Sequence, residues 1–300
     1  MSPTPSIEYS PQLASLADAL WNQGKTPADC AAIIRAVQES RISQAPVFAL
    51  KESFRSFETE LYPDAVERLL LACAVHESTL KIDSLLIHAS VKALIHNEFR
   101  AYLTPPGSGL RLIAGTNLFV VASKIATLRR FPAGPMDWVV SGIPRSWILK
   151  MPIMQAAAAL RCILKWFGGF KPAFYVHLAP PPRNRALVIP KEVRKAYYRM
   201  AKSLERQPEM KGIVCAAWFH DQDVLRETPH LYPLNEPYIE HGGRIVVRLG
   251  PAPADSGFLQ YNPERRKLYE SGRLQPNITL ALWPRMSALL WAEQHPELER

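Results

Sequence analysis

The sequence predicts an α/β protein in which a helical N-terminal region, residues 1–103, precedes a mixed sheet flanked by helices in residues 110–300. Two patterns support this fold class. Apolar residues recur at helical spacing through the first hundred residues, whereas short apolar runs of strand length alternate with helical segments in the last third. Between them, Thr104–Gly109 holds consecutive prolines and two glycines, which disfavour both helix and sheet. We therefore expect two structural parts that divide at this segment.

The N-terminal region contains a clear helix start at Thr26-Pro27-Ala28-Asp29. Threonine is a good N-cap, proline tolerates the first turn, and the acid lies at the positive end of the helix. An apolar stripe follows at Ala32, Ile33, Ile34 and Val37. Further helices are expected after Asp64 and over Leu85–Phe99.

The rest of the chain predicts the strands of the sheet and the helices that cover them. Phe119–Ala122 fits either a strand or a helix, and a helical pattern runs from Met154 to the glycine pair at 168–169. Proline-rich turns flank Asp137-Trp138. Strands are expected at 173–178, 212–219, 244–249 and 278–283, with helices at 190–207, 262–272 and 287–294.

Composition points to a globular protein of the cytosol. Residues of hydrophobic type make up 48% of the chain and charged residues 21%. The four cysteines are scattered without a C-x-x-C pair, which indicates neither a zinc site nor a disulfide framework and suits a reducing compartment. No secretory signal pattern begins the chain, and the apolar stretches 112–123 and 152–170 are too short or too charged to span a bilayer. We expect a cytoplasmic protein without a transmembrane segment.

The net charge of +9 is concentrated in the second half of the chain. Residues 151–200 contain one acid, Glu192, against nine basic residues: Arg161, Lys165, Lys171, Arg183, Arg185, Lys191, Arg194, Lys195 and Arg199. A run of this kind attracts phosphates, acidic proteins or anionic lipid headgroups, and it is equally typical of a solvated helix face.

The run Asn262-Pro-Glu-Arg-Arg-Lys-Leu-Tyr269-Glu270-Ser-Gly272 resembles a pattern of the GNAT acyltransferase superfamily. In that pattern an Asn after a strand opens a helix that carries Leu-Tyr-Glu and ends at a glycine. The resemblance covers the C-terminal third to half of the chain and implies a thioester donor, with Tyr269 as general acid towards the departing thiolate. A phenol suits that role because its pKa is near 10. The alternative is an amphipathic helix whose Leu268-Tyr269 faces the core.

The donor-binding turn of that family corresponds to Arg226-Glu-Thr-Pro229-His-Leu231. Arg226 matches the basic position, whereas Pro229 and Leu231 stand where the family has glycine and a small residue. Such a turn normally binds pyrophosphate through backbone N–H groups, and proline removes one of them. Relatives that take acyl groups from acyl carrier protein also diverge here, and a basic segment suits an acidic carrier. The resemblance therefore implies acyl-coenzyme A or acyl carrier protein as co-substrate, with Arg226 and Asn262 holding the donor and no permanently bound cofactor.

His220-Asp221 follows the predicted strand 212–219, where the family often places a base that deprotonates the acceptor amine. Histidine has an intrinsic pKa suited to this role; the alternative is a turn at a strand end. His76, His88 and His96 lack metalloprotease spacing, so no metal is expected, and no nucleic-acid-binding module is recognisable.

These observations predict a divergent acyltransferase that moves an acyl group from a thioester to an amine. Tyr269 would be the acid, and His220 or Asp221 the base. The alternative function is a non-catalytic adaptor that docks an acidic protein or a membrane surface through its basic 161–202 segment.

Overall fold

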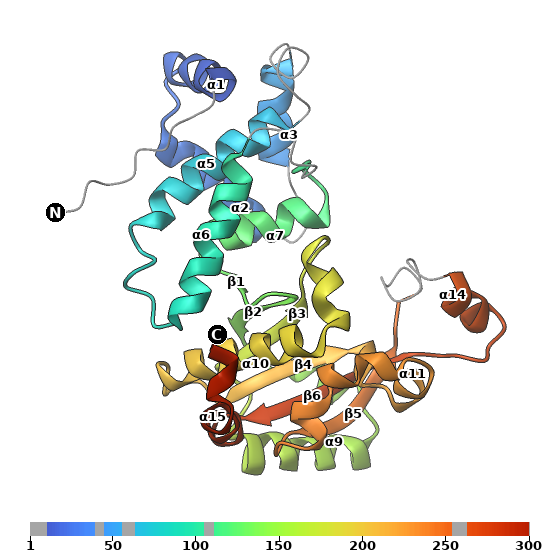
Figure 1. Cartoon of the computed structure of the whole chain (residues 1–300). Helices are drawn as coiled ribbons and strands as arrows, with labels where there is room; N and C mark the ends of the chain where they lie inside the picture. Colours follow the sequence, from blue (N-terminus) through green and yellow to red (C-terminus); the bar gives the residue numbers. More distant parts are fainter. Residues whose placement is uncertain (1–10, 40–44, 56–63, 105–110, 254–262, 300) are drawn as a thin grey trace. The chain divides into compact units, whose positions relative to one another are not determined.

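The computed structural model of the chain describes two compact units (Figure 1). The first comprises residues up to 85 together with 89–132, and the second comprises 86–88 and 133–300. A helical N-terminal region is followed by a mixed sheet flanked by helices, so the predicted α/β class is confirmed. The residues described are 11–39, 45–55, 64–104, 111–253 and 263–299.

The first unit is built around one almost completely buried helix, α5. Its residues Leu69, Leu70, Leu71 and Cys73 have no exposed surface. Packing on several sides explains why its sequence is apolar around most of its circumference rather than along one stripe. The helices of this unit are α1 (Pro11–Asn22), α2 (Pro27–Glu39), α3 (Ala45–Ser53), α5 (Ala65–Thr79), α6 (Ala89–Leu103) and α7 (Asn117–Ala126).

A buried ion pair fixes the start of α5 to the chain that follows α6. Arg68 Nε donates to Asp64 Oδ1 at 3.1 Å, and its Nη1 donates to the carbonyl oxygens of Tyr102 and Thr104. The other oxygen of Asp64 accepts the backbone N–H of Leu112 at 2.7 Å. Both charges are thus hydrogen-bonded as well as paired, which a buried pair requires in order not to destabilise the fold.

Residues 119–122, for which the sequence allowed strand or helix, lie in α7. The Thr116 side chain accepts the Phe119 N–H at 3.2 Å and caps this helix. Because α7 packs on α5 with Phe119, Val121 and Ile125 buried, it belongs to the first unit. The two units therefore divide between Pro132 and Ala133, and residues 105–110 of the predicted break lie outside the described residues.

A six-stranded mixed sheet has the order β1-β2-β3-β4-β6-β5, and its strands β2 to β6 belong to the second unit. Neighbouring strands run antiparallel at β2/β3, β4/β6 and β6/β5, whereas β3 and β4 are parallel. Asp137 and Trp138, predicted between turns, lie on β2. The strands are β1 (Phe131–Pro132), β2 (Met136–Ser141), β3 (Ala173–Leu178), β4 (Gly212–Ala217), β5 (Arg244–Pro251) and β6 (Asn277–Pro284).

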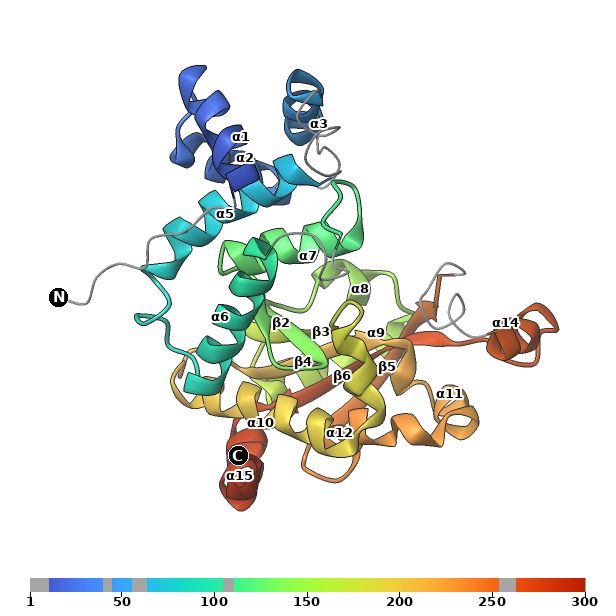
Figure 2. The same ribbon diagram turned by 45° about the horizontal axis from the view of Figure 1, so that its top comes forward.

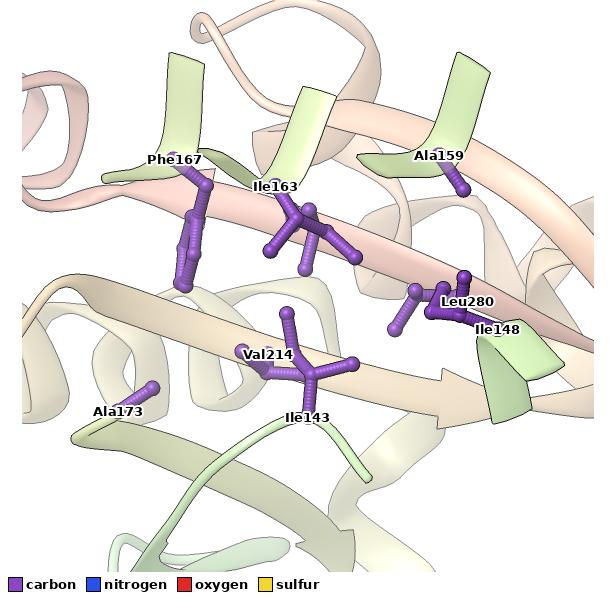
Figure 3. Packing of buried hydrophobic residues seen from close by; sticks show 9 residues of the cluster. Ile143, Ile148, Ala159, Ile163, Phe167, Ala173, Val214 and Leu280 are labelled. Atoms are coloured by element: carbon purple, nitrogen blue, oxygen red, sulfur yellow. The ribbon is translucent and has the colours of Figure 1, made fainter. Parts of the chain in front are cut away.

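Helices cover both faces of this sheet (Figures 1 and 2). On one face α8 (Arg145–Leu149), α9 (Ile153–Arg161) and the π-helical turn η1 (Cys162–Phe167) pack on Val214 and Leu280, as Figure 3 shows. On the other face Tyr197 of α10 (Pro190–Glu205) meets Trp283 edge to face. The remaining elements are η2 (Arg183–Val188), η3 (Trp218–His220), α11 (Gln222–Glu227), η4 (Pro229–Leu234), α12 (Glu236–Ile239), α14 (Pro263–Glu270), α15 (Arg285–Gln294) and η5 (Pro296–Glu299).

The apolar stretches 112–123 and 152–170 lie largely in α7 and in α9 with η1. None of the helices in the described ranges has both the length and the apolar character needed to cross a membrane.

Candidate functional site at the carboxyl end of β4

An open cavity of about 400 Å³ lies beside the carboxyl end of β4. It is lined by the segment that follows β4, by consecutive residues of the edge strand β5, and by β6. The lining residues are His220, Asp221, Gln222, Ile245, Val246, Val247, Arg248 and Thr279. The structure therefore brings the predicted base candidates His220 and Asp221 into one cavity.

The imidazole of His220 is fully buried and held in one tautomer. Asn235 Nδ2 donates to the carbonyl oxygen of Phe219 at 2.8 Å, so the Asn235 amide must turn its oxygen towards His220. That oxygen, Oδ1, lies 2.7 Å from His220 Nδ1. Nδ1 therefore carries the proton, and Nε2 carries the lone pair. Nε2 has no hydrogen-bond partner among the described residues, so this histidine offers a basic nitrogen that the fold itself does not use.

Burial also keeps this imidazole neutral. Desolvation lowers the pKa of His220 to about 4, and the hydrogen bond to Asn235 offsets only part of that effect. The imidazole is therefore unprotonated throughout the pH range 5–8. A histidine of this kind accepts a proton only from a group that becomes strongly acidic during a reaction.

Asp221 has a different environment, because both of its carboxylate oxygens are fully occupied. Oδ1 accepts the N–H of Asp223 at 3.0 Å and Arg248 Nη2 at 3.1 Å. Oδ2 accepts the backbone N–H and the Nδ2 of Asn277, both at 2.9 Å. The carboxylate thus caps α11 and fixes it to β5 and β6. It positions the elements around the cavity, and its lone pairs are already engaged.

The parallel strands β3 and β4 are paired over a short stretch only. These strands are in register at Phe174↔Ile213 and Tyr175↔Val214, and no further pairing is registered between residues 176–178 and 215–217 of these two described strands. Ligands of α/β sheets bind at the carboxyl ends of parallel strands, where the chain direction leaves polar groups unpaired. The carboxyl ends of β3 and β4 therefore form the second feature of the candidate site.

The other predicted site residues are not among those that line the cavity. Tyr269 of α14 is half-buried and packs with Leu268 and Trp218 against Val224 and Leu274. Arg226 has a side chain that is 74% exposed and forms an ion pair with Asp223. Asn262 lies outside the described residues. Tyr269 is thus near the segment that carries His220, whereas Arg226 is on the surface.

Most cations at the centre of the basic segment are engaged within the unit. Arg183 forms a bidentate pair with the buried Asp137, and Arg194 pairs with Glu236. Arg199 Nη1 donates to the carbonyl oxygen of Ala133 at 2.6 Å. Further pairs join Lys195 to Glu192 and Lys202 to Glu205. This part of the segment holds α10 and η2 in place.

Three side chains, Glu236, Glu240 and His241, have potential metal-ligand atoms within 4.8 Å of one another. The Glu236 carboxylate is already bound by both Nε and Nη2 of Arg194, and Glu240 accepts the hydroxyl of Tyr232. A cation here would compete with the guanidinium of Arg194, so this cluster is an ion-pair network in the structure described.

Two contributors to the candidate site had no signal in the sequence. Asn235 lies 15 residues from His220 and meets it only through the fold, and Thr279 enters the cavity from β6. Comparisons with protein-family models, with curated proteins and with solved structures find no match to this chain.

Proposed function

We propose that the second unit is a divergent acyltransferase that moves an acyl group from a thioester to an amine. The observation that supports this most directly is the neutral, tautomer-fixed imidazole of His220, whose Nε2 lone pair is unpartnered in a residue that lines the cavity. Asp221, with four donors on its carboxylate, is the weaker candidate for the base.

In the proposed reaction the amine nitrogen attacks the thioester carbonyl carbon. A C–N bond forms, and the nitrogen becomes positively charged and much more acidic than the free amine. In the proposal, Nε2 of His220, which is unprotonated at neutral pH, accepts that proton. The C–S bond then breaks, and the departing thiolate takes a proton from a general acid, for which Tyr269 remains the proposed group. The products are an amide and a free thiol.

The donor is proposed to lie at the carboxyl ends of β3 and β4. Backbone groups beyond the registered pairs can hydrogen-bond an extended, amide-containing arm such as that of coenzyme A or of acyl carrier protein. Arg226, exposed on α11, is then available to an anionic part of the donor. Acyl-coenzyme A and acyl carrier protein both remain candidates, with no permanently bound cofactor, and the protein is expected to work in the cytoplasm.

The test is thiol release from acyl-coenzyme A and from acylated carrier protein in the presence of amine acceptors. His220→Asn is the informative variant, because the asparagine amide can take the place of Nδ1–H towards Asn235 while Nε2 is lost. Turnover should fall by about 10²–10⁴-fold. The matched control is His230→Asn, since His230 is exposed. Equal turnover of the two variants would contradict the proposal.

The adaptor remains the alternative, although the ion pairs of Arg183, Arg194 and Arg199 leave less free charge in the 161–202 segment than its composition indicates. Thermal stabilisation by a thioester donor favours the enzyme. Absence of such stabilisation for both donors favours the adaptor.

A further inference from the structure

The outward face of α8 and α9 is unusually apolar. Leu149, Ile153 and Met154 are 85%, 86% and 82% exposed, which makes them the three most exposed large apolar side chains in the described ranges. Leu164, on the η1 turn that continues α9, is 54% exposed. Single exposed apolar residues are ordinary, but a group of them within one short segment marks an interaction surface. We call this surface, with its neighbouring cations, the α8–α9 face.

The fold does not need these side chains. The opposite side of the same segment covers the sheet with Ile148, Ala159, Ile163 and Phe167, as Figure 3 shows. Amphipathic helices on a sheet normally turn polar residues outward. Here apolar residues occur on both sides, and the outer set has no role in the core.

Positive charge surrounds the exposed apolar residues. Arg145, Lys150, Arg161 and Lys165 are exposed on the same short segment, and Arg244 of β5 lies over the ring of Trp166 at 4.7 Å. The sequence has no Asp or Glu between Asp137 and Glu192. The strands β5 and β6, which pack against α9 and η1, carry none either.

We propose that the α8–α9 face docks the protein on the surface of an anionic lipid bilayer. Apolar side chains would enter the boundary between headgroups and acyl chains, while the cations meet lipid phosphates. The half-buried Trp147 and Trp166 suit the same boundary, where tryptophan is enriched. A second copy of the chain is a poorer occupant, because a symmetric contact would bring uncompensated cations together. A protein partner would need a complementary shape, whereas lipid adapts to protruding side chains.

Co-sedimentation of the full chain with vesicles tests this inference independently of acyl transfer. The chain should bind vesicles that contain about one-third phosphatidylserine far better than pure phosphatidylcholine, and binding should weaken as salt rises. Lys150→Gln combined with Arg161→Gln should reduce partitioning by about 25-fold, since each cation near an anionic membrane is worth about five-fold. Leu149→Ser combined with Ile153→Ser should reduce it by at least about ten-fold.

Met286→Ser is the matched control, because Met286 is 71% exposed on α15, a different helix of the same unit. It should leave binding unchanged, and thermal melts should show that all variants fold. The inference is overturned if the chain does not bind phosphatidylserine vesicles at low salt, or if Met286→Ser loses as much vesicle binding as the other variants. It is also overturned if Leu149→Ser with Ile153→Ser abolishes self-association or capture of an acidic protein instead of vesicle binding.

Discussion

Replacing Asp221 by asparagine should destabilise the second unit by about 1–3 kcal/mol. The carboxylate accepts four hydrogen bonds, two at each oxygen. If the new NH₂ faces Asn277, two bonds are lost and a backbone N–H loses its partner, which costs about 1–3 kcal/mol for that group alone. If it faces α11 instead, the helix loses its N-cap, at about 0.5–2 kcal/mol. The pair with the half-exposed Arg248 adds little because solvent screens it.

Thermal unfolding of the full chain, followed by tryptophan fluorescence, measures this effect. Six of the seven tryptophans lie in the second unit, so the signal reports mainly on it. For a unit of this size the melting temperature should fall by about 2–12 °C. Asp223→Asn is the control: Asp223 is half-exposed and pairs with exposed arginines, so its change should be no more than about 2 °C.

The outcome also decides the role of Asp221. If Asp221 holds the neighbouring elements in place, replacing one of its oxygens lowers the stability of the protein. If it is a general base, the same replacement lowers turnover and leaves the melting temperature nearly unchanged. Equal melting shifts for the Asp221 and Asp223 variants, together with a large loss of activity in the former alone, would refute our reasoning from the four hydrogen bonds.

Three further predictions concern single side chains. The folded-state pKa of His220 is lowered to about 4, below the usual 6.5, so the unfolded chain binds more protons than the folded chain between these pH values. The free energy of unfolding should therefore fall by about 3 kcal/mol as the pH drops from 6.5 to 4. In urea titrations, His220→Asn should remove that part of the pH dependence. If the phenol of Tyr269 is the general acid, Tyr269→Phe should lower turnover by about 10²–10⁴-fold with little change in donor affinity. If Tyr269 only packs in the core, the variant should turn over at the rate of the unchanged protein and lose at most about 1.5 kcal/mol of stability. Arg199→Glu should destabilise the fold equally at low and high salt, because it replaces a hydrogen-bond donor to the Ala133 carbonyl oxygen by an acceptor. If the variant instead keeps its stability and loses partner binding only at low salt, Arg199 acts at the surface.

Local sequence determined most of the secondary structure. The strand at 173–178 and the basic helix that begins at Pro190 follow from apolar patterning and from proline at a helix start, which act within a few residues. The choice between strand and helix at 119–122 was only partly local. The Thr116 cap acts within three residues, whereas burial against α5 exists only in the folded unit.

Tertiary structure alone decided what the charged and polar side chains do. The sequence presented 161–202 as one basic surface, but Arg183 and Arg194 meet acids 46 and 42 residues away, and those pairings depend on strand order and helix packing. It presented His220 and Asp221 as equivalent bases, and only the fold supplies Asn235 to one and four donors to the other. Patterning fixes which residues are apolar enough to be buried. Contacts between distant segments decide which polar atoms remain unpaired after folding. Those contacts distinguish His220, a candidate base, from Asp221, whose carboxylate holds neighbouring elements in place.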